Sequence, residues 1–123
     1  MTISSSIKNA EKILPGKKSP DGENDRRWQA IIELGNYIES NPEDIWKFVS
    51  KWGSYKDEDL QSAIATCLLE HLLEYHFEFT FSKVENLVHK DKTFAQTFTL
   101  CAKFGQSCIP ENSKKFDILK SKI

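Results

Sequence analysis

The sequence predicts an all-α domain built from five to six short antiparallel helices, stacked side by side as two to three helical pairs. Apolar residues recur at helical spacing along most of the chain, and the segments that join these stripes are short. The one strictly alternating segment has no partner with which to form a sheet. With 123 residues, of which 39% are hydrophobic and 28% charged, the chain has material for one domain with a buried core.

Residues 1–23 are expected to form an N-terminal helix followed by a flexible linker, ahead of a helical domain at 24–123. The first stripe has helical spacing and consists of Ile3, Ile7, Ala10 and Leu14. Two prolines and two glycines between positions 15 and 22 then indicate a linker, and Asn24 or Asp25 is placed to cap the next helix.

Two amphipathic helices are expected next, at about 26–39 and 42–52. One face of the first is expected to consist of Trp28, Ile31, Ile32, Gly35 and Ile38. The second has a well-marked start, because Asn41 can accept hydrogen bonds from free backbone N–H groups and Pro42 needs no such partner. Its stripe is Ile45, Phe48, Val49 and Trp52. Gly53 is expected to take the left-handed closing position.

The central helix of the domain is predicted from Leu60 to about His76, after the acidic cluster Asp57, Glu58 and Asp59. Its apolar residues lie on most sides, which is typical of a helix packed on several faces. The alternating segment 77–81 is interpreted as a turn whose phenylalanines fill the core, with a strand as the alternative.

Three further features describe the C-terminal part. Ser82 and Glu85 fit a capping box, so a short helix is expected to start there. The next helix is expected to end at Gly105, with one face made of Phe94, Phe98, Cys101 and Phe104. A last short amphipathic helix is expected after Pro110, with Phe116, Leu119 and Ile123 as its apolar residues.

A weak internal repeat of about 35 residues favours helical pairs over a plain bundle, which remains the alternative. Apolar positions and a glycine in 28–35 recur in 98–105 at an offset of 70 residues, and part of the stripe at 45–52 recurs in 81–88. The stretch 65–77, with Lys103-Phe104-Gly105-Gln106 downstream, resembles small bacterial HEAT-like (armadillo-type) helical-repeat proteins without assigned activity. This resemblance covers about 24–120 and implies the fold and a bacterial origin, but no catalytic residue.

One group of side chains is a candidate for metal binding or catalysis. Cys67, His71 and Glu74 share a face of the central helix, and such side chains bind zinc or form a thiol–imidazole pair. A fourth ligand and a glycine turn for an oxyanion hole are both missing from the pattern. We therefore expect no enzyme, no cofactor and no metal, and keep an unrecognised enzyme or metal site at these three residues as an alternative.

Glu70, Glu74 and Glu78 form a row of like charges at a spacing of four residues, where lysine would have been the stabilising choice. We interpret this acidic ridge, with Asp57, Glu58 and Asp59 at its end, as a surface for a basic partner. The alternative is that neighbouring helices supply the opposite charges. Trp46 lies off its helix's apolar stripe, which suits either an interface anchor or packing against the next helix.

The distribution of charge and the number of cysteines bear on the partner and the cellular compartment. Residues 1–20 and 106–123 carry net charges of +3 and +2, whereas 21–105 carries −6. The odd number of cysteines and the absence of a signal-like or membrane-spanning stretch indicate a cytoplasmic protein. We expect a non-catalytic protein-binding module, such as an immunity protein that masks the basic surface of a bacterial toxin. A nucleic-acid-associated helical repeat is the alternative, disfavoured because only the chain ends are basic.

Overall fold

The computed structural model describes residues 2–14 and 26–123, and in these ranges all regular structure is helical. The expected linker at 15–22 and the cap at Asn24 or Asp25 lie outside the described residues. The elements are α1 (Ile3–Ile13), α2 (Arg26–Leu34), the 3₁₀ turn η1 (Gly35–Tyr37), α3 (Pro42–Trp52), α4 (Glu58–Ile64), the π-helical turn η2 (Ala65–Leu69), α5 (Glu70–Tyr75), α6 (Phe77–Lys90), α7 (Lys92–Thr99), the 3₁₀ turn η3 (Gly105–Cys108) and α8 (Pro110–Ser121).

The predicted all-α class is confirmed, but the predicted number of helices is wrong. Because α4, η2 and α5 run on without interruption, they form one helix from Glu58 to Tyr75. The described residues therefore contain seven separate helices.

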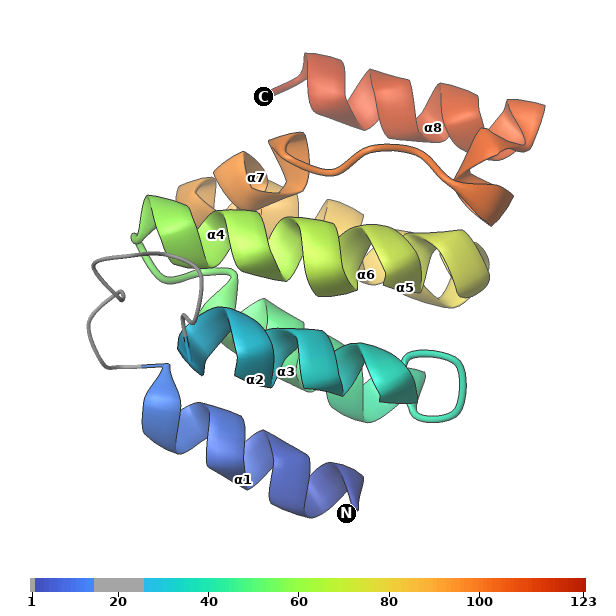
Figure 1. Cartoon of the computed structure of the whole chain (residues 1–123). Helices are drawn as coiled ribbons and strands as arrows, with labels where there is room; N and C mark the ends of the chain where they lie inside the picture. Colours follow the sequence, from blue (N-terminus) through green and yellow to red (C-terminus); the bar gives the residue numbers. More distant parts are fainter. Residues whose placement is uncertain (1, 15–25) are drawn as a thin grey trace.

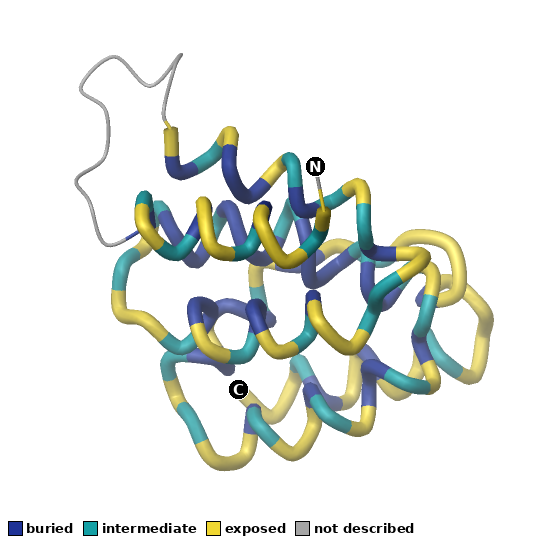
Figure 2. The backbone as a smooth tube through the Cα atoms, turned by 90° about the horizontal axis from the view of Figure 1, so that it is seen from below, coloured by how far each residue is buried: buried dark blue, intermediate teal, exposed yellow. Residues whose placement is uncertain are grey.

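The helices are arranged in layers that follow the chain order (Figure 1). α1 lies at one end, then α2 with α3, then the long α4–α5 helix with α6, and α8 lies at the opposite end beyond α7. In the burial view, the buried positions of the helices face their neighbours and the exposed positions face outward (Figure 2). Ala10 and Leu14 are buried, so α1 belongs to the same hydrophobic core as the other layers.

Residues 77–81 are neither a strand nor a turn, because they form the first turns of α6. His76 alone has non-helical dihedral angles, φ −139° and ψ 55°, and separates α5 from α6. Phe77 and Phe81 are both buried and stack at 4.9 Å. Together with Val84 and Val88 they are spaced three or four residues apart, so they lie on one face of a helix. This helical period accounts for the segment, and the alternation of residues 77–81 does not indicate a strand. Ser82 consequently lies inside the helix and caps nothing.

The predicted end of the next helix at Gly105 is also wrong, because α7 ends at Thr99. Tertiary contacts replace the helical hydrogen bonds beyond that point. The N–H of Ala102 donates to the Glu70 carboxylate at 2.7 Å, and Lys120 Nζ donates to the Cys101 carbonyl at 2.9 Å. Gly105 has φ +51°, and a Cβ there would lie 2.7 Å from Cγ of Glu74. Glycine is therefore required at this position by both conformation and space.

The predicted helix starts are partly confirmed. The central helix starts at Glu58, two residues before the predicted Leu60, and the Asp57 side chain caps it by accepting from the Leu60 N–H at 3.1 Å. Pro42 begins α3 as expected, but the Asn41 side chain makes no capping bond. It accepts from the Ser40 hydroxyl instead. Gly53 has φ −69° and is not left-handed. Its small size matters because the ring of Phe94 would lie 3.3 Å from an added Cβ.

Candidate functional site

The three glutamates of the expected acidic ridge do not form a continuous exposed strip. Glu70 is only 6% exposed, and its carboxylate accepts the Ala102 N–H described above. Glu74 is half-buried and lies 2.7 Å from Nδ1 of His71. Only Glu78 is exposed. The first two carboxylates therefore hold the segment after α7 and a neighbouring imidazole, and only Glu78 is available to a partner.

In the acidic cluster at the start of α4, two of the three carboxylates are likewise paired within the molecule. Arg27 of α2 donates to Asp57 at 3.0 Å and to Asp59 at 3.1 Å, and its own side chain is 6% exposed. Burial alone would raise the pKa of Asp57, but the hydrogen bond from Arg27, the Leu60 N–H and the guanidinium charge outweigh it and lower that pKa. Glu58, between the two aspartates, is exposed.

Trp46 packs within the molecule, because its ring meets that of Phe94 edge to face at 5.8 Å. The side chain is partly buried against the core. This contact joins α3 to α7 and gives the tryptophan a packing role. Of the two alternatives for Trp46, the structure shows packing against the next helix. Less of its surface is therefore available to a partner.

Cys67, His71 and Glu74 do share a face of the α4–α5 helix, but their surroundings are those of structural groups. His71 is held by Glu74 and stacks on Phe104, with ring centroids 5.9 Å apart. Burial, followed by the charge of Glu70, raises the pKa of the Cys67 thiol despite its contact with Thr66. A raised pKa lowers the thiolate fraction that nucleophilic attack or metal binding needs. Within residues 2–14 and 26–123, no three acidic, histidine or cysteine side chains are grouped to hold a metal ion.

The described surface carries a larger feature, a groove of about 820 Å³ between α6 and α8. We call it the α6–α8 groove. Its apolar lining includes two exposed isoleucines, Ile109 at 50% and Ile118 at 46%. The full lining consists of Phe77, Glu78, Phe81, Ser82, Glu85, Gln106, Ile109, Glu111, Asn112, Lys115 and Ile118.

The chain after α7 follows an irregular path before it forms the α8 wall of this groove. Residues 101–104 run in a non-helical path and lead into η3, which packs against α5. α8 then lies mainly against η3, and Phe116 anchors it to Phe98 of α7 at 4.9 Å. Figure 1 shows the non-helical segment running between α8 and the layer below it.

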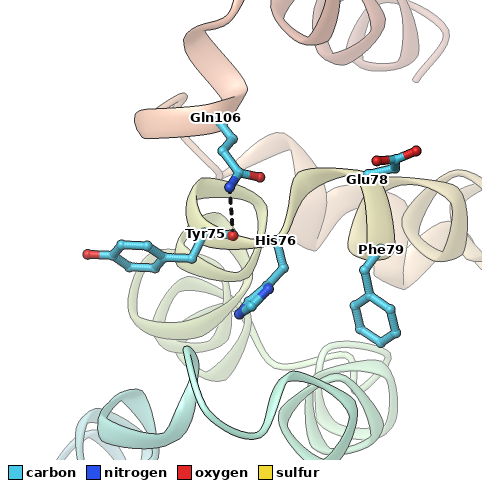
Figure 3. Close-up of a pocket in the computed structure, with 5 residues that line it drawn as sticks. All are labelled: Tyr75, His76, Glu78, Phe79 and Gln106. Carbon is cyan, nitrogen blue, oxygen red and sulfur yellow. Dashed lines mark hydrogen bonds between the residues drawn. The ribbon is translucent and has the colours of Figure 1, made fainter.

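One end of the groove is built at the junction of α5 and α6. The side chain of Gln106 accepts from the Phe77 N–H at 2.8 Å and donates to the Tyr75 carbonyl at 2.8 Å. Phe77 opens α6, so Gln106 satisfies a backbone donor that the helix itself cannot. In Figure 3, Glu78 and the Gln106 amide lie on one side of this junction, whereas Phe79 and His76 point to the other. A smaller hollow of about 470 Å³ at the same junction is lined by both Glu78 and Gln106.

The charges of the α6–α8 groove are not balanced by ion pairs. Among residues 2–14 and 26–123, no side chain forms an ion pair or hydrogen bond with the carboxylates of Glu78, Glu85 or Glu111. Lys115 is the one cation of the lining. Glu78 and Glu111 lie in the first turn of their helices, where a negative charge is stabilising in any case. Glu85 lies in the middle of α6, where the helix dipole does not stabilise a negative charge.

Sequence reasoning missed Glu85, Glu111, Ile109 and Ile118 as surface candidates. Glu85 was assigned to a capping box that does not form, because α6 begins before it. Ile118 does give a signal in the sequence. It lies off the stripe formed by Phe116 and Leu119, both of which are buried, so an apolar side chain there is predicted to face outward.

Comparison with known proteins adds no family to this description. No protein family matches the sequence, and no curated protein or solved structure is detectably similar to it. Among the described helices, none has the length and apolar character needed to cross a membrane. The function therefore has to be argued from the surface and its chemistry.

Proposed function

We propose that this chain is a non-catalytic protein-binding module of HEAT-like helical pairs whose partner presents a basic surface. The observation that supports this proposal is the α6–α8 groove, where glutamates without internal partners lie beside half-exposed isoleucines. Apolar area at the centre of an interface contributes affinity, while uncompensated charge at its rim speeds association and selects the partner.

Within this class we favour an immunity protein that masks a bacterial toxin. The chain is small and its middle is acidic, and the α6–α8 groove is a surface to which a partner can bind. Toxins that act on nucleic acid need basic active sites to bind phosphates, so an acidic groove is a suitable cover for one. Of the expected acidic surface, Glu78 is exposed and lines this groove together with Glu85 and Glu111, whereas Glu58 is exposed at the other end of the α4–α5 helix.

The test is photo-crosslinking in a lysate of the native cell, with a photoreactive amino acid placed at Ile118. The matched control carries the same amino acid at Ile32 of α2, which is exposed to a similar extent, 50% against 46%. We expect a basic protein to be captured from position 118 and not from position 32, with capture falling as salt rises. If that protein is a toxin, co-expression should relieve its toxicity.

Equal capture from both positions, or none from either, would contradict the proposal. A captured protein that is acidic, or whose capture does not depend on salt, would contradict the charge argument as well. Metal analysis of the purified chain tests the enzyme alternative independently. A stoichiometric metal that disappears in His71→Ala would replace protein binding with chemistry at Cys67, His71 and Glu74.

A further inference from the structure

The α6–α8 groove has the length and the helical walls that suit the packing of one more helix. Its two walls are helical faces: the lining positions of α6 extend from Phe77 to Glu85, and those of α8 from Glu111 to Ile118. At a rise of 1.5 Å per residue, each wall is about 10–12 Å long, or roughly two helical turns. A two- to three-turn helix lying lengthwise would therefore contact both walls along their whole length.

The backbone chemistry of the walls distinguishes a helix from an extended peptide. An extended segment usually binds by adding itself to the open edge of a sheet, where free N–H and C=O groups are available. The described residues contain no strand, so the groove offers no such edge. A helix satisfies its own backbone hydrogen bonds and needs only side-chain contacts, which the apolar lining supplies.

The charges specify the polar face of the occupant. Glu78 and Glu85 are two helical turns apart on α6, about 10 Å along the axis, and Glu111 faces them from α8. Among the described residues, no cation is paired with any of the three, and Lys115 is the only cation in the lining. Lysine or arginine residues seven positions apart on a partner helix would match the two glutamates of α6, with apolar residues between them directed at Ile109 and Ile118.

We propose that the α6–α8 groove binds one amphipathic, basic α-helix of a partner protein. This inference rests on the proposed function and specifies which structural element of the partner is recognised. The binding mode is helix-in-groove, in which apolar residues at i, i+3, i+4 and i+7 enter the groove and the flanking cations pair with its rim. The partner helix thus takes the place of a further helix packed between α6 and α8.

The experiment titrates the full chain, labelled for NMR, with a synthetic helical peptide of about 14 residues. The peptide carries leucines on one face and two lysines at the spacing of Glu78 and Glu85. One control peptide has the same composition in a scrambled order, and a second has glutamates in place of the lysines. We expect shifts concentrated on α6, α8 and η3 with the amphipathic basic peptide, and at least tenfold weaker binding, about one decade in Kd, with either control.

Matched variants of the chain separate the groove from general electrostatics. Glu85→Lys should weaken the basic peptide by about tenfold or more, while Glu43→Lys makes the same charge change on α3 and should leave binding unchanged. Ile118→Asp should abolish the shifts, and Ile32→Asp should not. Circular dichroism of each variant checks that the fold is kept, and Glu85→Gln provides a milder substitution if the lysine variant unfolds.

The outcomes distinguish this inference from the proposed function. Shifts that are equal for the basic and scrambled peptides, or that map to α1–α3, overturn the helix inference even if a partner is captured at Ile118. Concentration-dependent self-association that perturbs α6 and α8 without peptide also overturns it, because a second copy would then be the occupant. Capture of no partner at Ile118, together with specific peptide binding, overturns the proposed function and supports the groove chemistry alone.

Discussion

Arg27 carries a positive charge inside the contact between α2 and the start of α4, where two aspartates neutralise it. It donates to both Asp57 and Asp59, and the indole of Trp28 donates to Asp59 at 3.1 Å. A buried ion pair contributes little when complete, but loss of one partner is costly because the remaining charges stay poorly hydrated. The network therefore fixes how these two helices meet and is sensitive to single changes.

Arg27→Ala is expected to reduce the free energy of unfolding by about 2–4 kcal/mol. Fully buried pairs lose about 3–5 kcal/mol, and the side chains of Asp57 and Asp59 keep 37% and 21% of their exposure, which softens the loss. Urea denaturation measures it. Arg26→Ala is the matched control, since Arg26 is exposed, and should stay within about 0.5 kcal/mol of the wild type. Equal costs for the two variants would show that the ion pairs do not contribute.

Asp57 makes this network dependent on pH. Its pKa lies below the ordinary value of 3.8, so the native state binds its proton less tightly than the unfolded chain does. The stability it contributes is fully present above that value and is lost as the pH falls through the lower native pKa. Asp57→Asn keeps a capping residue at the start of α4 but removes the charge. The wild type should exceed this variant in stability at pH 6 and converge with it at acidic pH; a constant gap would contradict the prediction.

At the scale of elements, most helices are predictable because their signals are local. The stripe of α3, the cap of α4 and the proline that opens α8 each act within a few residues, and each appears in the structure. The predictions fail where residues distant in the sequence determine the end of a helix. α7 ends at Thr99 because Glu70 and Lys120 supply partners for the backbone that follows it. No pattern within residues 92–105 contains that information.

Gln106 is the side chain that joins elements across the α5–α6 junction. Gln106→Ala removes the acceptor for the Phe77 N–H and the donor to the Tyr75 carbonyl, and should cost about 1–3 kcal/mol in unfolding free energy. Hydrogen exchange should accelerate at the amide of Phe77 more than at amides of α3. Asn112→Ala is a milder comparison because it removes one bond, at 3.0 Å, to the Gln106 carbonyl. An unchanged exchange rate at Phe77 in Gln106→Ala would mean that the junction is held by packing alone.

At the scale of the whole molecule, the groove is the feature that sequence reasoning could not reach. The acidic ridge was inferred from a spacing on one helix, but burial of Glu70 and pairing of Glu74 depend on what packs beside that helix. The groove instead needs two helices separated by an irregular segment, and its lining includes Glu85 and Ile118, which are more than thirty residues apart in the sequence. Only the tertiary placement of residues 101–109 brings them together.

The layered arrangement predicts that stability is unequal along the stack. α8 lies at one end and is anchored by Phe116, which is fully buried against Phe98. Elements that contact only their neighbours tend to unfold from the ends. Phe116→Ala, a loss of about 3–5 kcal/mol where a phenylalanine is buried, should therefore release α8 while α2–α6 keep their protection from hydrogen exchange.

Phe94→Ala is the matched comparison, because Phe94 is equally buried but lies in α7 against Trp46. It should lower protection in all layers, since its neighbours belong to α3 and to the centre of the core. Native-state hydrogen exchange resolved by residue measures both variants. A uniform loss of protection in Phe116→Ala would show that α8 unfolds with the rest as one cooperative unit. Selective loss would mean that one wall of the α6–α8 groove can open without unfolding the domain, which lets an occupant order the end layer as it binds.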